Sequence, residues 1–119
     1  MAESKIEKPF TIEYTTQNVT LTLGSSSTVA KLQRYGKIYI LNLNGILNVT
    51  AANTVYGVGW LPSGSIPPTL NSHGVFAPIV SSQVKGIGRF SVLTTGQIQI
   101  ISNFAGNQEI SATVFWTIA

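Results

Sequence analysis

Apolar and polar residues alternate one by one along most of this chain, and this pattern restricts its fold more than any other feature. Successive side chains of a β-strand point to opposite faces, whereas a helix needs apolar residues about every 3.6 positions. Similar alternation covers residues 19–23, 38–43, 56–60, 90–100 and 109–118. In the last of these, Ile110, Ala112, Val114, Trp116 and Ile118 share one face, which we assign to the core. The pattern predicts an all-β fold of about nine strands.

Turn residues separate these segments. A Gly-Ser-rich turn follows residue 23, and Gly96 belongs to a turn that divides residues 90–100 into a hairpin. Three prolines exclude residues 61–73 from a central strand, so we expect a long loop there. A chain of 119 residues has room for one hydrophobic core. We therefore predict a single-domain antiparallel β-barrel or sandwich, Greek-key or jelly-roll-like, over residues 14–119, with a leader or attachment segment at residues 1–13.

The residue types needed for catalysis are nearly missing. The chain has no Asp and no Cys, one histidine (His73), and beyond residue 13 one acidic side chain, that of Glu109. A glycosidase normally needs two facing carboxylates, a Ser-His-Asp triad needs its acid, and metal sites need several clustered ligands. We therefore expect no enzymatic activity, no cofactor and no metal site.

Charge also narrows the range of partners. Charged residues make up 9% of the chain, and beyond residue 13 the cations are Lys31, Arg34, Lys37, Lys85 and Arg89. So few cations do not match a nucleic-acid backbone, where each neutralised phosphate needs its own Lys or Arg. No apolar run approaches the ~18 residues of a membrane span. A few cations on a neutral polar surface suit a neutral or mildly anionic glycan.

Two segments have apolar residues on both faces. Lys37 to Leu43 is apolar on each side, and Phe115 lies opposite the core face of the C-terminal strand. One interpretation is a central strand covered by loops, or scattered exposed apolar residues, which are common. The other is a subunit interface. We favour the interface, because low charge and the absence of disulfides both fit a chain that is stabilised by self-association.

A saccharide site needs an aromatic face for the sugar ring and polar groups for its hydroxyls. Trp60 and Tyr56 share a face of the strand predicted at residues 56–60, and Asn71 and His73 lie in the proline-containing loop that follows. Arg89 is on the opposite face of its strand from Phe90. Each residue has a purely structural alternative: Trp60 in the core, and Arg89 in an ion pair with Glu109. The five candidates are Trp60, His73, Arg89, Tyr56 and Asn71, in a pocket near residues 62–73.

From Gly59 onward the sequence resembles the head domain of receptor-binding and baseplate proteins of siphophages that infect lactococci and related bacteria. The resemblance rests on the order and spacing of several short segments over about half of the chain. These are Gly59-Trp60-Leu61-Pro62-Ser63-Gly64, Phe76-Ala77-Pro78-Ile79-Val80, Gly86-Ile87-Gly88-Arg89-Phe90, Gly96-Gln97-Ile98-Gln99-Ile100 and Val114-Phe115-Trp116-Thr117.

The resemblance implies a β head that forms a homotrimer at the tail tip or baseplate of a virion, exposed to the extracellular medium. Such a head attaches to host cell-wall polysaccharide without catalysis and contacts other phage tail proteins. Sites in this family use Trp, His, Arg and acidic side chains. The first three types are present here as Trp60, His73 and Arg89, whereas acidic side chains are nearly missing beyond residue 13. Two alternatives remain open: a baseplate or capsid-decoration protein that contacts only virion proteins, and a cellular carbohydrate-binding module.

Overall fold

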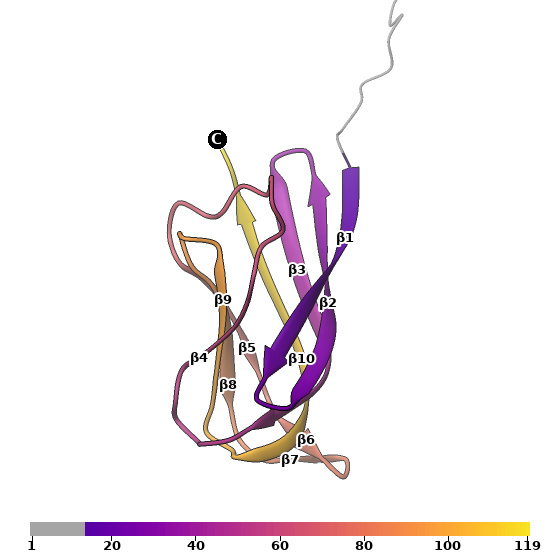
Figure 1. The fold of residues 1–119 in the computed structure, drawn as a ribbon, viewed down its shortest axis with the longest axis vertical. Helices are drawn as coiled ribbons and strands as arrows, with labels where there is room; N and C mark the ends of the chain where they lie inside the picture. The colour runs from indigo at the N-terminus through magenta and orange to yellow at the C-terminus, as the bar shows by residue number, and fades with distance from the viewer. Residues whose placement is uncertain (1–13) are drawn as a thin grey trace, which may run out of the picture.

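The computed structural model describes residues 14–119, which contain ten strands in two antiparallel sheets and no helix. Sheet A has the order β1 (Tyr14–Leu23), β2 (Ser26–Tyr35), β3 (Ile38–Val49), β10 (Gly106–Thr117), β6 (Ile79–Val80) and β7 (Gln83–Val84). Sheet B has the order β4 (Tyr56–Trp60), β9 (Gln97–Ser102), β8 (Gly88–Val92) and β5 (Ser72–Phe76). Figure 1 shows the sheets facing each other as a β-sandwich. The predicted leader, residues 1–13, lies outside the described residues.

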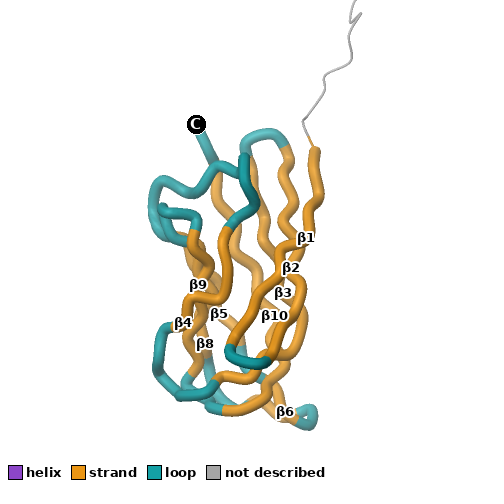
Figure 2. Tube along the Cα trace, in the orientation of Figure 1, coloured by secondary structure: helices purple, strands orange, loops and turns teal. Residues whose placement is uncertain are grey.

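The two architectures expected from the sequence were a barrel and a sandwich, and the sandwich is the one found. Its strands form four nested antiparallel pairs: β3 with β10, β4 with β9, β5 with β8, and β6 with β7. This nesting is of the jelly-roll kind, and the β1–β2 hairpin extends one sheet. The chain crosses between the sheets after β3, β5, β7 and β9. Its loops therefore gather at the two ends of the sandwich, as Figure 2 shows.

The predicted alternation is confirmed by the core. In β10, Ile110, Ala112, Val114 and Trp116 are buried, and the residues between them are exposed. The same rule buries Leu41 and Leu43 of β3 and Phe90 and Val92 of β8. Because adjacent side chains of a strand point to opposite faces, each sheet buries one face against the other and leaves one face in solvent.

The loop between β4 and β5 covers one end of the core. Strands β3 and β10 of sheet A have 12 residues each, against 5 or 6 for the strands of sheet B. Tyr39 and Trp116 lie near one end of these two long strands and stack on each other with ring centroids 5.2 Å apart. Ile66 of the loop closes over them: its backbone N–H donates to the Tyr39 hydroxyl at 3.3 Å, and its carbonyl accepts from the Trp116 indole at 3.0 Å. The predicted loop is thus confirmed, and its hydrogen bonds to Tyr39 and Trp116 keep it packed over the end of the core.

Two buried polar side chains, Ser102 at the end of β9 and Gln108 on β10, flank the turn between these strands. Gln108 is 1% exposed, and all the bonds of its amide group are local. Its Oε1 accepts from the Ser102 hydroxyl at 2.7 Å, and its Nε2 donates to the carbonyls of Phe104 and Gly106 at 2.7 and 3.0 Å. Because these groups satisfy one another, the turn is fixed without an unpaired buried polar atom.

The two sheets approach each other closely where β5 packs against β10. At Gly74 the backbone of β5 lies directly against the carbonyl of Thr113, so a Cβ at this position would overlap that oxygen. The neighbour is backbone and has little freedom to move away. Gly57 is also crowded, but there the neighbour is the amide end of the flexible Gln97 side chain.

We expect Gly74→Ala to lower the free energy of unfolding by about 2–3 kcal/mol, because overpacking against backbone forces the sheets apart. Gly57→Ala is the matched control and should cost about 1 kcal/mol or less, since the Gln97 amide can rotate away. Urea unfolding followed by circular dichroism measures both. Equal losses in the two variants would contradict the close contact between β5 and β10.

Candidate functional site

The outer face of sheet B gathers side chains from all four of its strands. Gln97, Gln99 and Ile101 of β9 point outward, because the alternating residues Ile98, Ile100 and Ser102 are buried. Strand register then sets their neighbours: Ser91 pairs with Gln99 and with His73, and Arg89 pairs with Ile101 and with Val75. Three of the five candidates, Trp60, His73 and Arg89, lie on this face.

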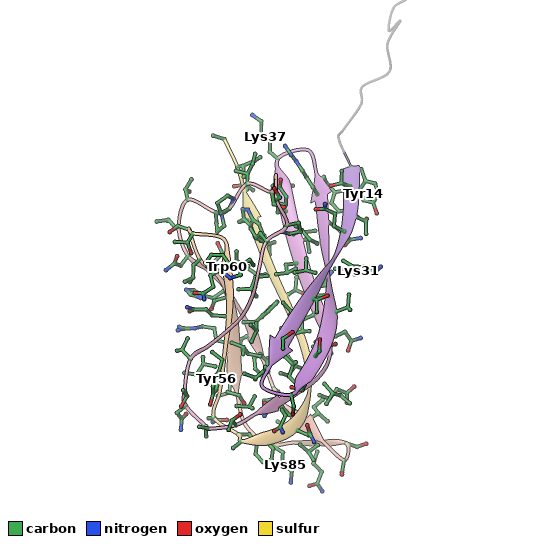
Figure 3. All side chains as sticks on the ribbon, in the orientation of Figure 1. Tyr14, Lys31, Lys37, Tyr56, Trp60 and Lys85 are labelled. Carbon is green, nitrogen blue, oxygen red and sulfur yellow. The ribbon has the colours of Figure 1, made fainter. Side chains whose placement is uncertain are left out.

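Trp60 ends β4, where it pairs with Gln97, and 60% of its surface is exposed. This exposure decides between the two interpretations open at the sequence level, since a core tryptophan such as Trp116 is 5% exposed. Figure 3 labels Trp60 on the sheet B side of the molecule, away from Tyr14 and Lys31 of sheet A. An exposed indole face is the group that stacks on the apolar side of a sugar ring.

A row of polar groups extends across the face from Trp60. The Gln99 side-chain amide donates to the Gln97 amide oxygen at 2.9 Å, and the Gln97 amide lies over Gly57, which has no side chain to displace it. At the other end, the His73 Nδ1 is 2.6 Å from the Ser91 hydroxyl, a hydrogen bond whose direction follows the tautomer of His73. We call His73, Ser91, Gln99 and Gln97 the polar row. Ser91 is 5% exposed and orients His73 from below, so the donors and acceptors that reach solvent are those of His73, Gln99 and Gln97.

Arg89 lies next to the polar row, two residues from Ser91 along β8. It borders a hollow of about 460 Å³ that is lined also by Val75, Ile87 and Ile101, with Asn53 and Asn103 among its polar side chains. The structural alternative, an ion pair with Glu109, is not found: Glu109 lies on β10 in sheet A, and Arg89 makes no ion pair with any described residue.

The structure does not place Tyr56 with this group, so its predicted face is wrong. The expectation that it shares the face of Trp60 assumed unbroken alternation, but a β-bulge between Gly57 and Gly59 shifts the register by one residue. Tyr56 consequently pairs with the buried Ile100, packs against the core and accepts a hydrogen bond from the backbone of Ala51 at 2.9 Å. A bulge re-aims every side chain on one side of it.

Asn71 also lies apart from the face. Its side-chain oxygen accepts from the backbone N–H of Thr94 at 2.9 Å, which ties the long loop to the β8–β9 turn. His73, expected in that loop, belongs to β5 instead. A hollow of about 170 Å³ does lie beside Ser63, Gly64 and Ser65 of the loop, but none of the five candidates lines it, and three of them lie on the face of sheet B instead.

The dimensions of this face define what it can hold. Trp60 and His73 are joined by the loop in sequence but stand on the two edge strands of sheet B. Three steps between neighbouring strands separate these edges by about 14 Å. A ligand that touches both is therefore extended.

Sequence reasoning missed Gln97, Gln99 and Ser91, although the Gln-Ile-Gln-Ile alternation at 97–100 is the signal that places both glutamines outward.

The outer face of sheet A has a different chemistry. Tyr14, Tyr35, Ile38, Ile40 and Phe115, which we call the sheet A patch, are neighbours through the pairs Tyr14–Tyr35, Tyr35–Ile38 and Ile40–Phe115. Phe115 is 67% exposed and Tyr14 is 55% exposed. The Thr16 hydroxyl donates to the Tyr14 oxygen at 2.7 Å and lowers the pKa of Tyr14, whereas burial raises the pKa of Tyr35. This is an apolar, partly aromatic surface.

Beside the patch lies a larger hollow, of about 570 Å³, lined by Asn42, Asn44, Ser111 and Thr113 of β3 and β10 with Val75 at its rim. Its polar groups bind one another: Ser111 donates to Asn44, and Thr113 donates to Asn42. Among residues 14–119, no three His, Asp or Glu side chains form a group that could hold a metal ion.

No model of a known protein family matches the sequence, and no curated protein is similar to it.

The exposure of the two tryptophans predicts a large difference between their alanine variants. Trp116→Ala should lower the free energy of unfolding by about 3–5 kcal/mol, since it opens a cavity and leaves the Ile66 carbonyl without its donor. Trp60→Ala should cost about 1 kcal/mol or less, because most of the side chain is already in solvent. Thermal unfolding measures both values. If Trp60→Ala lowered the free energy of unfolding as much as Trp116→Ala does, Trp60 would be a core residue and not an exposed one.

Proposed function

We propose that this chain is a non-catalytic saccharide-binding domain that serves as the head of a phage receptor-binding protein. In this proposal the domain attaches to host cell-wall polysaccharide from a virion tail tip or baseplate, exposed to the extracellular medium. One observation carries the binding function: the exposed Trp60 stands beside the polar row on one face of sheet B. The sequence resemblance to phage heads supplies the biological setting.

Each part of that face has a role in the proposal. Trp60 stacks on one sugar ring, while Gln97, Gln99 and His73 exchange hydrogen bonds with hydroxyls of the rings that follow. Strands rather than flexible loops hold these side chains, so little ordering is needed on binding. A long saccharide crosses the face from β4 to β5.

The absence of catalysis is part of the same proposal. Glu109 is the one acidic side chain among residues 14–119, and it lies on the outer face of sheet A. The face of sheet B therefore has no carboxylate side chain among the described residues. Hydrolysis of a glycosidic bond normally needs a general acid and a second carboxylate.

The sheet A patch supports self-association, which we propose to be a homotrimer as in the phage heads that this sequence resembles. The patch lies on the side of the sandwich opposite the polar row, so copies that associate through it leave the saccharide face open. Contiguous exposed apolar surface of this kind marks protein contacts. The same patch also favours the alternative function, a structural virion protein whose contacts are all with other virion proteins.

Binding to purified host cell-wall polysaccharide separates the two functions. We expect Gln99→Ala and His73→Ala to weaken binding by several-fold to about tenfold each, the cost of one or two lost hydrogen bonds. Trp60→Ala should weaken it at least as much. Thr113→Ala, a polar truncation on sheet A, is the control and should bind as the parent does. Absence of any saccharide preference on a glycan array would favour the structural alternative.

Sedimentation tests the association surface. We expect Phe115→Glu to shift the protein from trimer towards monomer at micromolar concentration, because a charge would be buried in an apolar contact. Val84→Glu is a matched control, since Val84 is 66% exposed against 67% for Phe115 but lies on β7, outside the patch. A parent protein that sediments as a monomer would contradict self-association outright.

A further inference from the structure

The hollow beside Arg89 combines an aliphatic surface with a positively charged side chain. A neutral sugar hydroxyl does not use these two together. Its aliphatic side is well exposed: Val75 is 67% and Ile87 58% exposed, and Ile101, which points outward from β9, is partly buried. Exposed aliphatic surface lining a concavity favours a ligand that brings an apolar group of its own.

The charged side of the hollow has no partner within the described part of the chain. No carboxylate or carbonyl of that part accepts a hydrogen bond from the Arg89 guanidinium, and Arg89 is the one charged residue on the outer face of sheet B among residues 14–119. A guanidinium presents its N–H donors in a planar fork that matches the two oxygens of a carboxylate. The hollow is therefore suited to an anion.

Two asparagines add donors near the guanidinium. The Asn103 side-chain oxygen accepts from the Ile87 N–H at 2.9 Å, and its backbone N–H donates to the Ile87 carbonyl at 3.1 Å. Its amide nitrogen makes no hydrogen bond to a described residue and is available as a donor. Asn53, held with φ 59° and bonded through its backbone to the Ser102 carbonyl at 2.7 Å, brings a second amide to the same hollow.

We propose that this hollow binds a carboxylate-bearing substituent that carries a methyl group, such as the lactyl ether or pyruvyl ketal of an acidic saccharide. The proposal rests on the proposed saccharide-binding function of sheet B. The carboxylate pairs with Arg89 and the asparagine amides, and the methyl group packs on Val75 and Ile101. A phosphate or sulfate ester would satisfy the guanidinium and leave the aliphatic side uncovered.

The position of the hollow fits a substituent on a bound sugar. Arg89 and Ser91 are about 7 Å apart along β8, the spacing of two residues in a strand. A sugar ring over Ser91 and Gln99 therefore directs a ring substituent towards Arg89, while the remaining rings continue towards Trp60.

The test compares N-acetylmuramic acid with N-acetylglucosamine, which differ only by the lactyl ether. By titration calorimetry or NMR, we expect the parent protein to bind the acidic sugar about tenfold more tightly, the effect of a charge-assisted hydrogen-bond pair. Arg89→Gln should remove this preference. Arg89→Lys should keep part of it, because the positive charge remains but the planar guanidinium that can bind both carboxylate oxygens is lost. Val75→Thr, equal in size and exposed, should reduce it by replacing a methyl contact with a hydroxyl.

Equal binding of the two sugars by the parent, or a preference that survives Arg89→Gln, would overturn the assignment of the hollow while leaving saccharide binding in place. Inorganic phosphate that competes as well as lactate does would overturn the requirement for a methyl group. Lactate alone also reports on the hollow without the rest of the face: it should shift the NMR signals of the Val75 and Ile101 methyl groups in the parent and not in Arg89→Gln. Lactate binding without binding of either sugar would instead contradict the proposed function of the polar row.

Discussion

The packing of two sheets on each other is the contact on which the rest of this structure depends. The chain has no cysteine, so no disulfide holds it together. The chain also passes repeatedly from one sheet to the other, which means that neither sheet is completed before the other is in place. Leu41, Val114, Phe90 and Ile98 are almost completely buried between the sheets, and the loop that carries Ile66 closes the end of the core. The hydrophobic effect acting on these inner faces is the main source of stability.

Because the inner faces supply the stability, the outer faces are free to differ. The outer face of sheet B carries Trp60, Arg89 and the polar row. The outer face of sheet A carries the aromatic and aliphatic side chains of the sheet A patch. The two surfaces lie on opposite sides of the sandwich, and Val75 marks the edge at which the hollows of the two sides meet. In a thin sandwich this division follows directly from the alternation of side chains along each strand.

The rigidity of the polar row bears on the proposed binding. Its side chains stand on β5, β8 and β9, and two of its contacts, His73 with Ser91 and Gln99 with Gln97, are hydrogen bonds within the row. Side chains that are already oriented by their neighbours lose less conformational entropy when a ligand arrives. The Arg89 hollow continues this surface along the strands, so an extended and an acidic ligand would use the same face.

The sequence by itself determined the all-β class, the buried face of the segments at residues 19–23, 38–43, 90–100 and 109–118, and the scarcity of carboxylates, because alternation and composition are local properties of the covalent chain. It also placed Trp60, His73 and Arg89 among the candidates. Only the tertiary structure decided that these three share a face, that Gln97, Gln99 and Ser91 stand between them, and that Gln108 of β10 is buried beside the turn that precedes this strand. It also moved Tyr56 to the core, since the bulge between Gly57 and Gly59 is invisible in the period-two pattern. Strand neighbours and register arise from pairing between segments far apart in sequence, and that pairing depends on how the whole core packs.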